Sequence, residues 1–247
     1  DFAGKLFLNP GDVVLCESPS YLGALNAFNA YEPTFVEVPT DDGGLLPEEL
    51  DKILETTPNC KFIYVIPDFQ NPTGRTWSME RRQKFMEVVN KHNLPVLEDN
   101  PYGELRFEGE ILPSLKSMDT KGLVMFLGTF SKVFCPGLRL GWVAAEKGLL
   151  GEFIKIKQSA DLHTSNFDQG VADAFMDAYD LDAHVAKIVE LYRHRRDLIL
   201  ATMEAELPAG CTWTHPEGGL FLWLSMPEGV SARKVFNKCI EMKVAAV

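Results

Sequence analysis

The chain has 247 residues, of which 46% are hydrophobic and 24% are charged, and its formal net charge is -11. A chain of this length and composition can bury a substantial core and lacks the bias of disordered sequences. The acidic charge argues against partners that are bound through phosphate attraction, because such binding needs clustered Lys and Arg. We therefore expect neither nucleic acid nor a membrane surface as a partner.

The five cysteines are widely spaced and contain no Cys-x-x-Cys pair. This spacing predicts neither a disulfide framework nor a metal site and is typical of a reducing compartment, so we expect a cytoplasmic protein. No apolar run approaches the roughly 18 residues that a membrane-spanning helix needs. The first eight residues resemble the later part of an amphipathic helix, and the last four end inside an apolar run. We expect the sequence to be a piece of a longer protein.

Between residues 13 and 144, short apolar runs alternate with helical patterns, which is typical of an α/β unit with a mainly parallel sheet. The runs are apolar on both faces, so helices are expected on both sides of the sheet. Pro47 opens one intervening helix, and Ser78 is expected to cap another. The expected strands are 13–16, 34–38, 62–66, 96–98, 124–127 and 141–144.

After Gly148 the pattern becomes helical, and a long amphipathic helix is predicted from about Asp182 to Leu207. The basic run at 193–196 within it predicts a solvated helix face. Strands are expected at 212–214 and 219–224, followed by a helix from Ser231. We place a domain boundary inside the long helix, which gives a large domain (1–190) and part of a small one (191–247). The apolar stripe of the long helix comprises Val185, Ile188, Val189, Tyr192, Ile199 and Met203.

Four polar segments stand at or just beyond the carboxyl ends of predicted strands, where open α/β sheets place their ligand sites. Each has an ordinary interpretation by itself. Asn71 to Gly74 consists of residues that are typical of a turn, Asp99 is a plausible helix cap, and Lys132 alone resembles a surface lysine. The segments are Ser18-Pro19-Ser20-Tyr21, Asn71-Pro72-Thr73-Gly74, Glu98-Asp99-Asn100-Pro101-Tyr102 and Gly128-Thr129-Phe130-Ser131-Lys132.

Together these segments indicate one chemistry. A lysine, an aspartate, a tyrosine and an asparagine at one sheet edge match a pyridoxal ring, whose aldehyde, ring nitrogen and phenolic oxygen each need a partner. The hydroxyls of Thr129 and Ser131 and the planar guanidinium of Arg139 offer a phosphate site. For Thr129 the alternative is a hydroxyl that is satisfied by its own backbone. The sequence therefore predicts pyridoxal 5'-phosphate (PLP) as the cofactor.

At these residues the chain resembles the fold-type I PLP-dependent aminotransferases of class I and II, in particular the branch of 2-aminoadipate and kynurenine aminotransferases. The resemblance continues through Asp99–Phe107 and Pro136–Trp142. It implies an α/β fold, with a mainly parallel sheet flanked by helices and a smaller α+β C-terminal domain. It also implies a homodimeric transaminase that moves an amino group between an L-amino acid (aminoadipate-like, aromatic or broad range) and a 2-oxo acid such as 2-oxoglutarate.

The resemblance implies a role for each matching residue. Lys132 would be joined covalently to the cofactor and would then move the proton at the alpha carbon of the substrate. Asp99 would face the ring nitrogen and keep it protonated. Asn71 and Tyr102 would hydrogen-bond the phenolic oxygen, and Tyr21 would stack on the ring. The phosphate would be held by Thr129, Ser131 and Arg139.

Two parts of the family pattern fall outside this sequence, so the donor amino acid is left open. A glycine-serine-glutamine turn that contacts the phosphate would precede Asp1, and the arginine that binds the substrate carboxylate would follow Val247. Residues 215–223 resemble the strand beneath the substrate. His163 and Asn166 stand at the head of a helix, where a place near the site is one interpretation and capping by Asn166 is the one that we expect.

Two other functions are compatible with the same cofactor residues. The first is the sensor domain of a PLP-binding transcription regulator, which would carry a helix-turn-helix before Asp1. The Asp99-Asn100-Pro101-Tyr102 segment argues against it, because such domains more often carry an Asp-Tyr-Asp type of segment. The second is a carbon-sulfur lyase, in which beta-elimination replaces the return of the amino group. The motifs do not separate that reaction from transamination.

Overall fold

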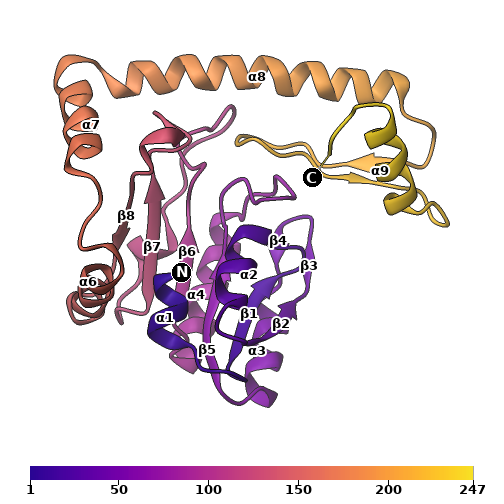
Figure 1. The fold of residues 1–247 in the computed structure, drawn as a ribbon. Coiled ribbons are helices and arrows are strands. Elements are labelled where there is room, and N and C mark those ends of the chain that lie inside the picture. Colours follow the sequence, from indigo (N-terminus) through magenta and orange to yellow (C-terminus); the bar gives the residue numbers. More distant parts are fainter. Residues whose placement is uncertain (247) are drawn as a thin grey trace.

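The computed structural model describes residues 1–246 and contains a central six-stranded sheet with helices on both faces (Figure 1). The strand order is β2-β1-β5-β6-β7-β8; all neighbours are parallel except β8, which is antiparallel to β7. The mainly parallel sheet and its six predicted strands are confirmed. The strands are β1 (Val13–Glu17), β2 (Thr34–Val38), β5 (Cys60–Val65), β6 (Val96–Asp99), β7 (Val124–Thr129) and β8 (Gly141–Ala144).

Alternating side chains of the central strands enter two separate apolar layers. Phe62 and Tyr64 point into one layer, whereas Ile63 and Val65 point into the other. The first layer is closed by α1 (Phe2–Phe7), α2 (Leu22–Asn29) and α6 (Lys147–Asp161). The second is closed by α3 (Pro47–Thr56), α4 (Met79–His92) and α5 (Leu115–Met118). A small hairpin of β3 (Thr40–Asp41) and β4 (Gly44–Leu45) precedes α3.

Most predicted helix starts are confirmed. Pro47 is the first residue of α3, and the Ser78 hydroxyl accepts a hydrogen bond from the backbone N–H of Arg81 at 3.2 Å. The cap predicted at Asn166 is wrong. Ser165 caps α7 (Asn166–Ala178) by accepting from the backbone N–H of Asp168 at 3.3 Å, and Asn166 is already helical. Two residues with capping side chains are adjacent here, and the chain turns at the first of them.

The long helix is confirmed as α8 (Leu181–Glu206), but none of its side chains is fully buried. Most of its predicted apolar stripe is half-buried, whereas Ile199 is 48% exposed. The prediction of a solvated basic face is wrong for Arg196, whose side chain is only 11% exposed. Its guanidinium donates to the carbonyl oxygen of Pro216 at 2.9 Å, pairs with Glu108 and lies over the ring of Phe107. Arg196 therefore fastens α8 to two other segments.

Beyond α8, β9 (Thr212–Trp213) and β10 (Leu224–Ser225) form a two-stranded antiparallel sheet, and α9 (Ala232–Glu241) follows the capping residue Ser231. The strand predicted at 219–224 is wrong for residues 219–223. Gly219 has a φ of +74°, and its N–H donates to the carbonyl oxygen of Leu105 at 2.9 Å. Gly219 therefore lies against Leu105, whereas the carbonyl oxygen of Trp223 accepts from the N–H of Thr214 at 3.0 Å.

Among the described residues, no helix is both long enough and apolar enough to cross a membrane. The predicted apolar run at the end of the chain reaches Val247, which lies outside the described residues.

Candidate active site

The carboxyl ends of β1, β5, β6 and β7 lie side by side, because these four parallel strands are consecutive in the sheet order. Tyr21 follows β1, Asn71 follows β5, Tyr102 follows β6 and Lys132 follows β7. Neighbouring strands in a sheet are about 4.8 Å apart, so these loops share one edge. The structure therefore brings together the four segments that the sequence analysis singled out.

Asp99 is the last residue of β6, and its carboxylate is held by Tyr64 of β5. The Tyr64 hydroxyl donates to Asp99 Oδ2 at 2.6 Å. Burial raises the pKa of Asp99, and the hydrogen bond from Tyr64 opposes that rise. The sequence analysis missed Tyr64, because a tyrosine inside an apolar strand is typical of a core residue. Its only signal is a hydroxyl in an otherwise apolar run.

The hydroxyl of Tyr102 is influenced by three other predicted cofactor residues. The pKa of Tyr102 is raised to about 12, because the effects of burial and of the charges of Asp99 and Tyr21 outweigh the hydrogen bond with the Asn71 amide, which lowers it. These three side chains therefore lie near the Tyr102 hydroxyl. The ring of Tyr102 also meets that of Phe221 edge to face, with centroids 5.7 Å apart. Phe221 belongs to the segment after α8, which thus reaches the site.

The buried Gln70 joins the loop after β1 to the loop after β5. Its Nε2 donates to the carbonyl oxygen of Pro19 at 2.7 Å, and its Oε1 accepts from both the N–H and the hydroxyl of Thr73, at 2.8 and 2.6 Å. A Cβ on Gly74 would lie 2.4 Å from the carbonyl oxygen of Phe221, so only glycine fits there. The sequence analysis missed Gln70, which fixes the loops that carry Tyr21 and Asn71.

Lys132 is half-buried in the turn that follows β7. Just before it, the Thr129 hydroxyl donates to the carbonyl oxygen of Leu140 and accepts from the N–H of Ser131, both at 3.1 Å. The Thr129 hydroxyl thus makes both of its hydrogen bonds with backbone groups, as the alternative interpretation expected. Arg139 is exposed, has a φ of 54° and donates to the carbonyl oxygen of Pro136 at 3.0 Å. The phosphate contacts of Thr129, Ser131 and Arg139 stay predictions.

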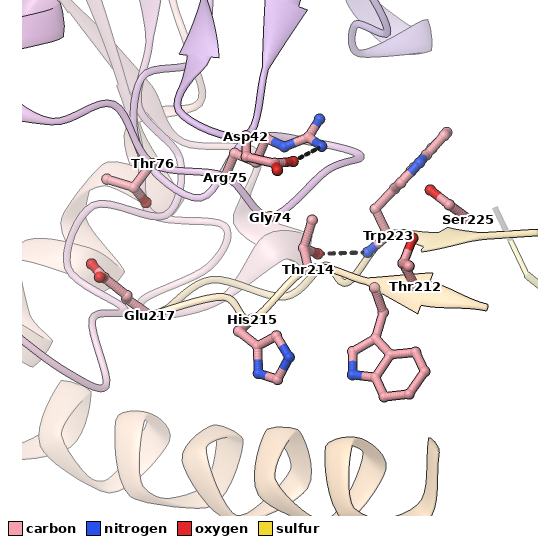
Figure 2. Close-up of a pocket in the computed structure, with 11 residues that line it drawn as sticks. Asp42, Gly74, Arg75, Thr76, Thr212, Thr214, His215, Glu217, Trp223 and Ser225 are labelled. Carbon is pink, nitrogen blue, oxygen red and sulfur yellow. Dashed lines mark hydrogen bonds and ion pairs between the residues drawn. The ribbon is translucent and has the colours of Figure 1, made fainter. Parts of the chain in front are cut away.

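A cavity of about 520 Å³ lies next to this edge, between the loop after Gly74 and the β9–β10 sheet (Figure 2). Arg75 pairs with Asp42 at 2.7 Å on one wall, and the Thr214 hydroxyl accepts from the backbone N–H of Trp223 at 2.9 Å on the other. None of the eight predicted site residues lines this cavity. It is therefore a separate feature from the predicted cofactor site.

A mainly parallel sheet with Lys132, Asp99, Tyr102 and Asn71 at its carboxyl edge is the arrangement of fold type I. The family described as aminotransferase class I and II matches residues 1–247. The chain belongs to this family.

The relatives include aminotransferases and a transcriptional regulator. The chain is 43% identical to aromatic-amino-acid aminotransferase 1 of Thermococcus litoralis, covering 100% of this chain and 60% of that protein. It is similar to a Pyrococcus horikoshii kynurenine aminotransferase structure, with a TM-score of 0.95, 41% identity and coverage of 100% and 62%. It is also 32% identical to an uncharacterized HTH-type transcriptional regulator of Bacillus subtilis, covering 94% and 48%. The chain thus spans about three fifths of the aminotransferases it matches.

Proposed function

We propose that the protein is a PLP-dependent transaminase that moves an amino group between an L-amino acid and a 2-oxo acid such as 2-oxoglutarate. The observation that supports this most is the shared sheet edge of Lys132, Asp99, Tyr102 and Asn71. When bound, PLP supplies an aldehyde that takes up the amino group and a ring that accepts the electrons released at the substrate alpha carbon.

The residues at this edge suit that cofactor. Asp99 is a carboxylate in a place where burial raises its pKa, so a cationic partner such as a protonated ring nitrogen would favour its charged form. The Tyr102 hydroxyl and the Asn71 amide can both donate to a phenolic oxygen. Lys132 is accessible enough to meet an aldehyde. In this proposal each reactive group of the ring would have a partner of the right chemistry.

In this proposal Lys132 holds the cofactor and then moves a proton to and from the substrate alpha carbon. Asp99 holds the proton on the ring nitrogen, and Tyr21 packs on the ring face. Tyr102 and Asn71 orient the phenolic oxygen. The residues that would bind the phosphate are Thr129, Ser131 and Arg139.

The proposed donors are aminoadipate-like, aromatic or of broad range. The similarity to an aromatic-amino-acid aminotransferase and a kynurenine aminotransferase supports the aromatic and kynurenine members of that range. The Phe221 ring beside Tyr102 adds an apolar surface that suits such side chains. We further propose a homodimer, as the resemblance to the family implies, and a cytoplasmic location, as the spacing of the cysteines indicates. The division into a large domain (1–190) and part of a small domain (191–247) is also a proposal, supported by a sheet that is complete before α8.

A panel of amino donors with 2-oxoglutarate, run on the full-length protein, tests the proposal. Transfer of the amino group with formation of glutamate is the expected result. Release of pyruvate without glutamate would favour the carbon-sulfur lyase. The other alternative is the sensor domain of a PLP-binding transcription regulator. The similarity to the HTH-type regulator of Bacillus subtilis is the observation that favours it. Specific binding of a DNA fragment, together with no turnover of any donor, would favour it.

A further inference from the structure

Tyr64 lies in the interior of β5, where it is 1% exposed. Its partner across the parallel ladder is Leu97 of β6. Because side chains alternate along a strand, Asp99 lies on the same face as Leu97, one step nearer the carboxyl edge. The Tyr64 side chain reaches along this face until its hydroxyl meets Asp99 Oδ2 at 2.6 Å. Both ends of the contact are therefore fixed by strands rather than by loops.

The Tyr64 hydroxyl stays protonated and can therefore donate its hydrogen bond to Asp99. Burial and the charge of Asp99 both raise the pKa of Tyr64 well above its usual value, so the hydroxyl keeps its proton. A hydrogen bond that is donated to a carboxylate stabilises its ionised form. Among residues 1–246, the hydrogen bond from Tyr64 is the one contact that lowers the pKa of Asp99 against the effect of burial.

We propose that Tyr64 is a positioning residue for Asp99, holding the carboxylate by Oδ2 so that Oδ1 faces the ring nitrogen of the cofactor. This inference rests on the proposed function above. A carboxylate that is anchored at one oxygen cannot rotate freely, so its charge stays aimed at one point. The tyrosine acts through Asp99 and needs no contact with the substrate.

The test uses full-length protein loaded with PLP that is isotope-labelled at the ring nitrogen, whose NMR signal reports the proton on that atom. In Tyr64→Phe, the proton moves toward the carboxyl, so the signal shifts toward that of a neutral ring. We expect the Kd for PLP to rise roughly tenfold, the effect of about 1.4 kcal/mol. Tyr31→Phe is the matched control, because it removes a 2.7 Å hydroxyl-to-carboxylate bond with Asp1 at the surface. A Tyr64→Phe signal equal to that of wild type overturns the proposal.

A second measurement needs no cofactor. In the cofactor-free protein, the carboxyl NMR resonance of Asp99, assigned by its loss in Asp99→Asn, should titrate at higher pH in Tyr64→Phe than in wild type. An unchanged titration would contradict the proposal. If Tyr64→Phe fails to fold, a ring-fluorinated tyrosine at position 64 replaces it. Because the fluorinated hydroxyl is a stronger donor, Asp99 should then titrate at lower pH than in wild type. The absence of any shift would again contradict the proposal.

Binding of PLP by the wild-type protein separates a failure of the proposed function from a failure of the proposed role of Tyr64. If wild-type protein binds no PLP, the proposed function fails. If wild type binds PLP and Tyr64→Phe behaves identically, only the role of Tyr64 fails.

Discussion

Residues 1–144 and residues 181–246 are held in place in different ways. The first region has two apolar layers on either side of its sheet, and its central strands are almost completely buried. In the second region, Pro216, Gly218 and Gly219 are the only buried residues. All three contact the first region or lie beside residues that do. One region thus depends on a core, and the other on a local attachment.

That attachment is a short stretch of backbone contacts. The N–H groups of Phe107 and Glu108 donate to the carbonyl oxygen of Glu217, at 2.7 and 3.1 Å, and Arg106 pairs with the Glu217 side chain at 2.8 Å. The predicted cofactor residues all belong to the first region, whereas the second brings Phe221. The difference indicates that the first region holds the predicted cofactor residues rigidly, and that the second region, which lies beside them, opens more easily.

The largest expected effect comes from replacing Lys132 in the first region. Lys132→Ala should lower turnover at least 10²–10⁴-fold, the usual contribution of a positioned acid-base group, because no other residue would hold the cofactor and move the proton. Borohydride reduction with peptide mapping should label Lys132 in wild type. Lys121→Ala is a control, since Lys121 bonds the backbone of Asn90 at the surface. Labelling of a different lysine would refute the assignment.

Matched phenylalanine truncations compare the two regions directly. Phe85 is fully buried against Trp77, whereas Phe236 of α9 is 41% exposed. Phe85→Ala should lower the free energy of unfolding by about 3–5 kcal/mol, and Phe236→Ala by less than about 1 kcal/mol. Denaturant unfolding of the full-length protein measures both. Equal losses would mean that the second region has a core of its own in the whole protein.

The core of the first region should also respond to pH through Glu17. Burial raises the pKa of this carboxyl from 4.5 to about 7, despite hydrogen bonds from Ile66 and Trp77. The folded protein therefore binds the proton more tightly than the unfolded chain, and stability falls as pH rises from about 4.5 to 7. The loss should be on the order of 3 kcal/mol, because each unit of pKa difference corresponds to about 1.4 kcal/mol. Glu17→Gln should flatten this part of the unfolding profile; an unaltered slope would assign it to other groups.

The smallest expected effect is confined to the attachment. A Cβ at Gly218 would lie 2.3 Å from the Phe69 ring and 2.5 Å from the carbonyl oxygen of Leu105. Gly218→Ala should cost about 1–2 kcal/mol and increase hydrogen exchange in residues 216–223, with the sheet left protected. Gly151→Ala is the control, because nothing lies within 4 Å of its added Cβ. Equal exchange in both variants would show that the attachment is not the weak point.

The sequence was sufficient for the sheet and for the loops at its edge. Strands such as 124–129 are short apolar runs, and turn residues like those of Asn71–Gly74 mark where they end. Parallel strands then place the loops at one edge without further information. The roles of the eight predicted site residues stay predictions, because they concern contacts with a cofactor.

The features that the sequence analysis missed depend on tertiary contacts. Tyr64 has the pattern of a core residue until the register with Leu97 brings it to Asp99. Residues 219–223 alternate like a strand, but a positive φ at Gly219 turns them toward Leu105. Arg196 has the pattern of a surface residue until α8 crosses Glu108. Local periodicity describes each segment well but does not say which distant segment it meets.

The contact between Arg106 and Glu217 joins residues that are 111 positions apart in the chain. During synthesis, all six strands of the central sheet leave the ribosome before Glu217 does, since β8 ends at Ala144. Domains generally form in that order as the chain emerges. Closing a loop of this length costs little more than closing one half as long, because the entropy of closure grows only logarithmically. The edge that carries Asp99 and Lys132 can therefore be complete before its outer wall arrives.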